Sequence, residues 1–213
     1  MALFITFEGV EGSGKTTQID RIGRWLQEVK VPCLITYEPG GSLLGKELRS
    51  LLLERISLKI SRRAELLLFA ADRAQHVEEV IIPALGEGKM VLCDRFSDAT
   101  IAYQGSGRGL DLAIIEAIND FAAHSMKPDL TFLFDLPAES GLERVEVRTF
   151  NAGGIDGEDR FEREHLDFHK EVRKAYLRIA AAEPDRFRII DASKDRDAVF
   201  QEVSRVISGV LGI

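Results

Sequence analysis

The residues best suited to chemistry lie near the N-terminus, where the stretch from Gly9 to Thr16 fits the pattern G-x-x-x-x-G-K-[ST] at every fixed position. Glycines let a backbone curl so that successive N–H groups point inward at an anion. The lysine places a positive charge on terminal phosphates, and the next hydroxyl ligates a Mg²⁺ that bridges them. The pattern predicts a polyphosphate-binding loop; the alternative is a glycine-rich turn that binds nothing. The expected phosphate-binding residues are Gly9, Val10, Glu11, Gly12, Ser13, Gly14, Lys15, Thr16 and Thr17.

A second candidate group follows the apolar run 90–93. Asp94 ends this run, and a carboxylate there can hold Mg²⁺ from the side opposite the loop hydroxyl. Arg95 comes next, where it could face a second phosphate. We therefore predict Thr16 and Asp94 as the metal ligands.

These groups need strands and helices to bring them together. Apolar runs typical of buried strands recur at 3–7, 33–36, 90–93, 130–134 and 187–190, with helical patterns between them. This alternation predicts an α/β fold with a mostly parallel sheet and helices on both faces. Ligands in such sheets gather at the carboxyl ends of the strands. We therefore expect the turn 38–42, which begins with Glu38, to line the same site.

Two helical patterns carry further candidates. Residues 61–85 read as a long helix on which Phe69 and Arg73 share a face, because they are spaced i, i+4. A phenyl ring beside a guanidinium can hold a flat heterocycle, with stacking from Phe69 and a hydrogen bond from Arg73 to a carbonyl. The alternative is a core phenylalanine. Residues 45–53 read as a second helix, with Arg49 beside its apolar side.

Two glycine-containing segments remain open to more than one interpretation. Residues 103–109 form a glycine-rich loop that begins with Tyr103 and Gln104, and its alternative is a flexible linker into a helix near Asp111. Residues 149–159 follow a helix at 138–147 and are polar. The arginines at 144, 148 and 160 bracket this segment, which is typical of a lid that closes over phosphates. The alternative is a surface loop with solvated arginines.

His165 and His169 are spaced i, i+4, as a metal-binding pair could be. The helical pattern around them is highly charged. We therefore expect both histidines on an exposed face rather than in a zinc site.

Composition narrows the class of protein. With 213 residues and 45% hydrophobic content the chain suits one α/β domain with a substantial core. A net charge of −7 argues against nucleic acid or an anionic membrane as the main partner. Cys33 and Cys93 read as buried thiols of a reducing compartment. The N-terminus does not resemble a signal peptide, and no apolar stretch approaches the ~18 residues of a membrane span, so we expect a cytoplasmic protein.

Several short segments, taken in order, are similar to those of bacterial thymidylate kinases along essentially the whole chain. They are FEGVEGSGKTT, EPGG, LRSLLL, LLLFAADR, DRF, AYQGSGRG, PDLTFLFDL, DRFE and IDAS. The resemblance implies a P-loop NTPase fold with a five-stranded parallel sheet, a single domain over residues 1–213 and a mobile lid at about 144–160. It also implies transfer of the γ-phosphoryl group of ATP to dTMP, with Mg²⁺, in a homodimer.

The resemblance also implies roles for individual residues. Lys15, Arg95 and Arg148 would be catalytic, with Arg144 as a further lid arginine. Glu11 would reach the sugar 3′-hydroxyl of the acceptor. The other acceptor-binding residues would be Glu38, Arg49, Phe69, Arg73, Arg95, Thr100, Tyr103 and Gln104.

Within this set, Phe69 would stack on thymine and Arg73 would bond its O4. Thr100 and Gln104 would read the rest of the thymine edge. Tyr103 would disfavour ribose. Arg49 and Arg95 would hold the acceptor phosphate.

The chain also departs from the common pattern of that family. Tyr37 stands where many members have arginine, Ala99 where serine is frequent, and the lid is longer than in the short bacterial forms. The nearest rival function is another small P-loop kinase with a different acceptor. A rival of another class is a nucleotide-dependent switch, although the N-K-x-D motif of familiar GTPases is absent from the sequence.

Overall fold

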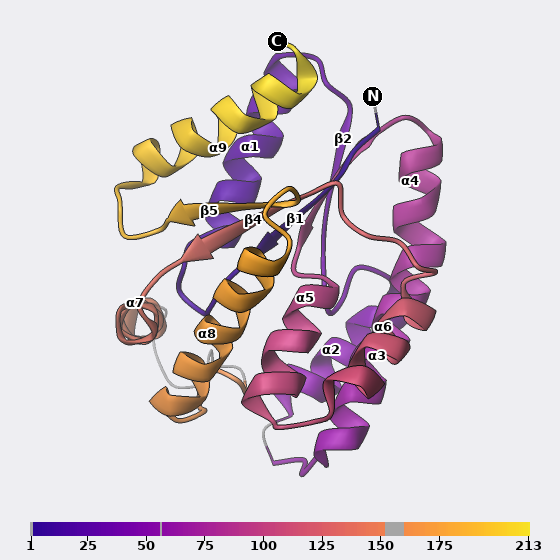
Figure 1. Ribbon diagram of the computed structural model, residues 1–213, viewed down its shortest axis with the longest axis vertical. Coiled ribbons are helices and arrows are strands. Elements are labelled where there is room, and N and C mark those ends of the chain that lie inside the picture. Colours follow the sequence, from indigo (N-terminus) through magenta and orange to yellow (C-terminus); the bar gives the residue numbers. More distant parts are fainter. Residues whose placement is uncertain (1, 56, 152–159) are drawn as a thin grey trace.

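Parallel strands form the centre of the structure, a computed structural model that describes residues 2–55, 57–151 and 160–213. The strands are β1 (Phe4–Glu8), β2 (Cys33–Tyr37), β3 (Met90–Asp94), β4 (Leu130–Asp135) and β5 (Phe187–Asp191), and their order in the sheet is β2-β3-β1-β4-β5 (Figure 1). Each strand lies within one residue of its predicted run, and each pairing is parallel. The prediction of an α/β fold with a five-stranded parallel sheet is confirmed.

Helices fill the crossovers between the strands (Figure 1). The α-helices are α1 (Lys15–Glu28), α2 (Leu43–Arg49), α3 (Arg62–His76), α4 (Ile82–Gly86), α5 (Ser97–Thr100), α6 (Leu112–Ala122), α7 (Ala138–Asn151), α8 (Leu166–Ala182) and α9 (Arg196–Leu211). Wider π-helical turns are η1 (Ser50–Glu54), η2 (Val77–Ile81) and η3 (Ile101–Gly107). Within the described residues, no helix combines the length and the apolar character needed to cross a membrane.

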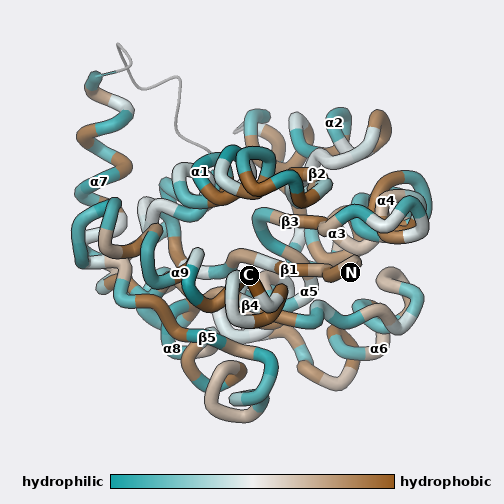
Figure 2. Tube along the Cα trace, turned by 90° about the horizontal axis from the view of Figure 1, so that it is seen from above, coloured by the Kyte–Doolittle hydropathy of each residue, from teal (hydrophilic) through white to brown (hydrophobic). Residues whose placement is uncertain are grey.

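The core lies on both faces of the sheet, because successive side chains of a strand point to opposite sides. Ile5 and Phe7 belong to the larger buried cluster, whereas Phe4 packs in a second cluster with Val77 and Ile81. The central strands β1 and β3 are accordingly among the most hydrophobic parts of the chain (Figure 2). Cys93 is buried, but Cys33 is only half-buried, so the prediction of two buried thiols is wrong for Cys33.

Two segments differ from their sequence predictions. The pattern at 61–85 is helical throughout, but its winding widens in η2 just before Pro83, whose ring cannot donate a backbone hydrogen bond. The predicted glycine-rich loop at 103–109 is wrong for its first part, because residues 101–107 form η3. The π-helical winding continues α5 and carries Tyr103 and Gln104 inward, where both are buried.

Helix α7 projects from the body of the molecule (Figure 2). It extends to Asn151, beyond the predicted end at Val147, and so includes the first part of the predicted lid. The rest of that lid, residues 152–159, lies outside the described residues. The root of α7 packs directly on the phosphate loop: a Cβ added to Gly12 would lie 2.1 Å from the Gly141 carbonyl oxygen.

Candidate active site

A single continuous cavity of about 1510 Å³ opens at the carboxyl ends of the strands. Drug-sized ligands occupy pockets of roughly 300–1,000 Å³, so this volume can hold two nucleotides. It is lined by almost every residue predicted to bind a ligand; Gly9 and Val10 are the exceptions and lie outside its wall. The parallel sheet thus brings the two halves of the predicted site together.

The loop between β1 and α1 has the backbone shape that the motif predicts. Gly12 and Gly14 adopt φ angles of 68° and 87°, in the left-handed region that favours glycine. Gly14 is also the residue immediately before α1, so the loop leads directly into the positive end of a 14-residue helix. Inward-facing amides and a helix N-terminus form an anion-binding cradle.

Lys15 folds back into this loop. Its ammonium donates to the carbonyl oxygens of Gly9 and Val10 at 3.0 and 2.9 Å and to Ser13 Oγ at 3.3 Å. Burial, together with the positive charge of Arg95, lowers the pKa of Lys15 to about 8. The Lys15 ammonium thus lies on carbonyl oxygens of the phosphate-binding loop, and from there it can move toward a bound phosphate.

Thr16 and Asp94, predicted as metal ligands from opposite ends of the site, are in contact. Thr16 Oγ1 donates to Asp94 Oδ2 at 2.7 Å, and both line the cavity. Mg²⁺ takes hard oxygen ligands and usually binds through one or two protein oxygens, with phosphate oxygens and water completing its shell. The hydroxyl and carboxylate facing the cavity fit that requirement.

Arg95 and Glu11 meet between the phosphate loop and the rest of the cavity. Arg95 Nη1 donates to the Gly9 carbonyl oxygen at 3.0 Å, and Nη2 lies 3.1 Å from Glu11 Oε1. The same carboxylate oxygen accepts from the Tyr103 hydroxyl at 2.5 Å. The guanidinium also lies over the Tyr103 ring, 4.9 Å from its centroid. A residue predicted for the acceptor phosphate and two predicted for the acceptor sugar thus form one contact group.

His169 joins this group, which corrects a sequence prediction. His165 is exposed, but the His169 side chain is only 1% exposed, and its Nδ1 lies 3.0 Å from Glu11 Oε2. A carboxylate only accepts, so the proton lies on Nδ1. Burial alone would raise the pKa of Glu11, but the His169 hydrogen bond and the charge of Arg95 outweigh it and lower that pKa to about 2. Glu11 is therefore a fixed carboxylate.

Arg73 is held by an almost complete set of acceptors. Its Nε bonds Glu38 Oε2 at 2.9 Å, and Nη1 bonds Asn119 Oδ1 at 2.7 Å. Nη2 bonds the Phe96 carbonyl oxygen at 3.1 Å and Thr100 Oγ1 at 3.0 Å. A guanidinium has five N–H donors, so within the described part of the chain these four bonds leave one N–H for a ligand. His76 fixes Glu38 from behind, with Nδ1 2.9 Å from Oε1.

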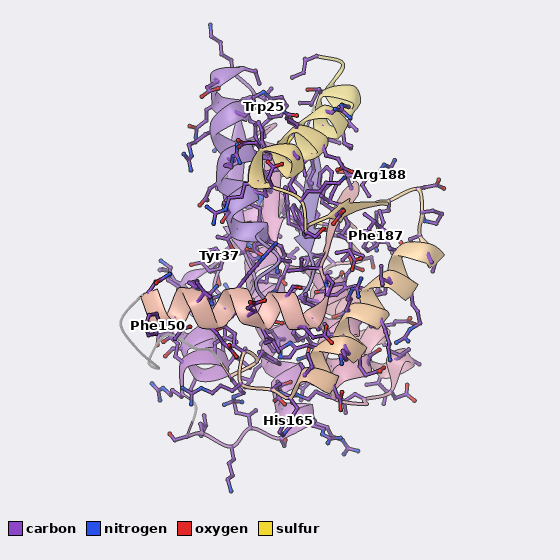
Figure 3. All side chains as sticks on the ribbon, turned by 90° about the vertical axis from the view of Figure 1, so that its left-hand side faces the viewer. Trp25, Tyr37, Phe150, His165, Phe187 and Arg188 are labelled. Atoms are coloured by element: carbon purple, nitrogen blue, oxygen red, sulfur yellow. The ribbon has the colours of Figure 1, made fainter. Side chains whose placement is uncertain are left out.

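The other predicted acceptor residues surround this point. Phe69 is half-buried in the cavity wall, and its ring centroid lies 6.0 Å from that of Phe161. Gln104 donates its Nε2 to Glu65 Oε1 at 2.9 Å. Arg49 donates to the Pro39 carbonyl oxygen at 2.8 Å and lies over the Tyr37 ring, at the end of β2 (Figure 3). The Tyr37 ring therefore supports the Arg49 guanidinium.

The arginines near the predicted lid have different surroundings. Arg144 Nη1 lies 3.1 Å from the Ala192 carbonyl oxygen and 3.4 Å from that of Gly12, beside the phosphate loop. Arg148, one turn further along α7, pairs with Glu162 at 2.5 Å, and both arginines are exposed. Both line the cavity, whereas Arg160 donates to the Leu58 carbonyl oxygen at 2.7 Å and does not.

Sequence reasoning missed several residues that shape the site. Asn119, His76 and Glu65 gave no usable signal, because each lies in a helical pattern whose inward face cannot be located without tertiary contacts. Residues 192–196 and Val199 line the cavity near the contact between α1 and α9. Their only signal was position, because they follow the carboxyl end of the last strand.

Comparisons with known proteins point to one family. The family model for thymidylate kinase matches residues 7–203. A thymidylate kinase from Syntrophus aciditrophicus is 51% identical over 205 residues, 96% of this chain and 94% of that protein. One from Pelobacter propionicus is 53% identical over 193 residues, 91% of this chain and 88% of that protein.

A solved structure extends the likeness to three dimensions. The crystal structure of thymidylate kinase from Ehrlichia chaffeensis superimposes with a TM-score of 0.77 at 34% identity, covering 97% of this chain and 98% of that one. The likeness therefore spans the fold and nearly the full sequence.

Proposed function

The chain belongs to the thymidylate kinase family, and we infer that it is a nucleoside-monophosphate kinase that transfers the γ-phosphoryl group of ATP to dTMP, giving ADP and dTDP. The observation that carries this function is the single cavity in which a phosphate-binding loop faces a base pocket across Arg95. A phosphoryl transfer between two nucleotides needs this arrangement.

The donor half is assigned to the loop and α1. Residues 9–17 would receive the phosphates of ATP through backbone amides, with Lys15 turning from its own loop carbonyls to the terminal phosphates. Thr16 and Asp94 would hold Mg²⁺, which when bound neutralises charge on the β- and γ-phosphates. Residues 192–196 and Val199, which line the cavity, would hold the adenosine end.

The acceptor half is assigned to the opposite end of the cavity. Phe69 would stack on thymine, and the one spare N–H of Arg73 would reach its O4. Thr100 accepts from Arg73, which leaves its own proton free for the base edge. Glu11 would accept from the sugar 3′-hydroxyl, with Tyr103 beside the 2′ position. The buried Glu38 would contribute indirectly by holding Arg73.

The reaction then follows from electrostatics. An oxygen of the dTMP phosphate forms a bond to the γ-phosphorus, the bond to the oxygen bridging the β- and γ-phosphorus atoms breaks, and ADP leaves. The attacking phosphate is already an oxyanion at pH 7, because its second pKa is about 6, so no general base is needed. The barrier is repulsion, about 4 kcal/mol for two unit charges ~4 Å apart at an effective dielectric of 20.

Cations around the cavity would offset this repulsion. Arg95 and Arg49 would hold the acceptor phosphate, and Lys15 the donor phosphates. Arg144, beside Gly12, and Arg148, further along α7, would face the transferring group from the other side. Closure over the cavity would exclude water, which would otherwise hydrolyse ATP.

We also propose a cytoplasmic homodimer. Large apolar side chains are exposed along α2, α3 and α6, with Leu43 at 79%, Leu67 at 57% and Phe121 at 86%. These helices are neighbours in the structure (Figure 1), and exposed apolar surface of this kind marks a protein interface. Free Cys33 and Cys93 agree with a reducing compartment.

The test is an ADP-release assay with ATP, Mg²⁺ and one acceptor at a time: dTMP, dUMP, dCMP, dGMP or AMP. We expect dTMP to give the highest kcat/KM by at least an order of magnitude. Fast transfer to a purine monophosphate would favour a different nucleotide kinase. Slow ATP hydrolysis with transfer to none of the five would favour a nucleotide-dependent switch.

A further inference from the structure

The side-chain amide of Gln104 is held in one orientation. Its Nε2 donates to Glu65 Oε1 at 2.9 Å, while no hydrogen bond to its Oε1 is found among the residues that the structure describes. Gln104 lines the cavity, although the residue is only 2% exposed. The amide therefore turns its donor away from the base pocket and leaves its acceptor for a ligand.

Glu65 dictates this orientation, because a carboxylate accepts hydrogen bonds and cannot donate them. Arg108 holds that carboxylate in place: its Nε lies 3.0 Å from Oε1 and its Nη2 3.2 Å from Oε2. The Glu65 side chain is 3% exposed, so water does not compete for it. With both oxygens occupied by donors, a flipped Gln104 would set its carbonyl oxygen against a buried negative charge.

Arg108 is itself fixed, on the side away from Glu65. Its Nη1 pairs with Glu164 at 2.6 Å, and its guanidinium lies over the Phe168 ring, 4.8 Å from the centroid. Its position therefore does not depend on Glu65 alone. Arg108, which follows η3, and Glu65, at the start of α3, form a clamp around one end of Gln104.

The polar groups that remain available to a bound base form a defined set of hydrogen-bond donors and acceptors. Arg73 offers one N–H, and Thr100 offers its hydroxyl proton, because its oxygen already accepts from Arg73. Gln104 offers a carbonyl oxygen. A donor beside an acceptor matches a pyrimidine with a carbonyl at C4 and a proton on N3. Cytosine presents the reverse pattern, an amino group and a bare ring nitrogen.

We propose that Glu65, held by Arg108, is a specificity-determining positioning residue: it fixes the Gln104 amide so that the pocket accepts a hydrogen bond from N3–H and rejects cytosine. Glu65 touches no substrate and acts through Gln104. The proposal rests on the proposed function, because it assumes that the base of the acceptor lies beside Gln104.

The variant Glu65→Gln tests this, because a glutamine is nearly the same size but no longer dictates the Gln104 orientation. We expect the KM for dTMP and for dUMP to rise together by roughly tenfold, the effect of one hydrogen bond, with kcat and the KM for ATP within about twofold of wild type. The kcat/KM for dCMP should change less than threefold, so the preference for dTMP over dCMP narrows.

Glu164→Gln is the matched control, because Glu164 also pairs with Arg108 but does not contact Gln104. It should leave the preference for dTMP over dCMP within about twofold of wild type. Equal loss for dTMP, dUMP and dCMP in Glu65→Gln, or no loss at all, would overturn the proposal. A wild-type chain that phosphorylates no pyrimidine monophosphate would instead overturn the proposed function.

A measurement on the wild-type protein avoids any question of folding. In an NMR spectrum of the dTMP complex, the side-chain NH₂ protons of Gln104 should show no strong nuclear Overhauser contact to the N3 proton of dTMP, because the group remains bound to Glu65. A strong nuclear Overhauser contact between that NH₂ group and the N3 proton of dTMP would show the opposite orientation and overturn the proposal.

Discussion

Arg95 is bound in place before any substrate arrives. Its main chain adopts a φ of 68°, a left-handed conformation that costs a non-glycine residue about 1–2 kcal/mol. The backbone N–H of Arg95 donates to the Phe7 carbonyl oxygen at 3.1 Å, so β1 holds this turn at the end of β3. The strained turn directs the guanidinium back across the sheet, to Glu11 and the phosphate loop.

We predict that Arg95→Ala lowers kcat by two to three orders of magnitude, because a cation facing the acceptor phosphate would be lost from the transition state. The Kd for ADP should change less than about threefold. Arg188→Ala is the control, since Arg188 is an arginine outside the cavity that donates to nearby carbonyl oxygens (Figure 3). Steady-state kinetics and calorimetry measure the two effects, and an unchanged kcat would remove Arg95 from the mechanism.

Lys15 gives a pH dependence. Burial and the charge of Arg95 lower its pKa in the free protein to about 8, so the neutral amine predominates above that pH. A neutral amine does not attract phosphate, and ADP is already fully ionised at pH 8. We predict that the Kd for ADP rises above pH 8 by up to about tenfold per unit, the limit for one proton.

Calorimetric titrations of ADP without Mg²⁺, from pH 6.5 to 9.5, would measure this dependence. In Lys15→Arg the side chain stays charged throughout this range, so the Kd should be nearly flat above pH 8. A wild-type profile that matches the arginine variant would contradict a lowered pKa.

Residues in local patterns could be predicted from the sequence, and residues that act across the fold could not. Thr16 and Asp94 are 78 positions apart, but each belongs to a recognisable local pattern that ends or follows a strand. His169 bonds Glu11 from 158 positions away. Its helix is charged on one side only, and average polarity did not indicate that the other side was buried.

At the scale of elements, the phosphate loop and α7 share a backbone contact without side chains between them. A Cβ on Gly12 would lie 2.1 Å from the Gly141 carbonyl oxygen, and a Cβ on Gly141 would lie 2.4 Å from the Glu11 carbonyl oxygen. Neither backbone can retreat easily, because the loop joins β1 and Gly141 lies inside the first turns of α7. This contact can be tested by three alanine variants.

We predict that Gly12→Ala raises the Kd for ADP at least tenfold and lowers the thermal midpoint, because it combines left-handed strain with a clash. Gly14→Ala separates the two effects: φ is 87°, but nothing lies within 4 Å of its Cβ, so only strain of about 1 kcal/mol is added. Gly141→Ala carries the clash without the strain. If Gly14→Ala were as damaging as Gly12→Ala, the contact with α7 would not matter.

The strands were predictable to within one residue, because continuous apolar runs bounded by polar residues have few alternatives. The π-helical turns were not. Residues 101–107 contain two glycines that normally signal a loop, and only packing against α8 and α6 makes them helical. The end of α7 at Asn151, beyond the predicted end at Val147, could not be predicted from a local pattern either.

At the scale of the whole molecule, charge is unevenly distributed. The chain has a net charge of −7, whereas the described residues that line the cavity include eight Lys or Arg side chains and seven Asp or Glu side chains. The cavity lining is therefore less negative than the rest of the chain, and cations such as Lys15 and Arg95 supply the local positive charge that an anionic ligand needs there.

We predict that the wild-type chain sediments as a dimer and that Phe121→Glu shifts it toward monomer, because a charge would be buried in the interface between α6 helices or their neighbours. Phe150→Glu is the matched control: Phe150 is 84% exposed, as Phe121 is 86% exposed, but lies at the far end of α7 (Figure 3). Sedimentation equilibrium at micromolar concentration decides between them. A monomeric wild type, or equal dissociation in both variants, would contradict the proposed interface.

The close backbone contact between Gly12 and Gly141 affects the order in which the arginines of α7 can reach a bound nucleotide. Because the backbone of α7 at Gly141 packs closely against the phosphate loop, we expect any bending of α7 to occur beyond Gly141. Arg144 lies about one turn after Gly141 and Arg148 about two turns after it. If α7 bends beyond Gly141, Arg144 therefore moves little and Arg148 moves further. We therefore expect Arg144 to contact the donor nucleotide as soon as it binds. Arg148 should reach the transferring group only after the C-terminal end of α7 has moved toward the cavity.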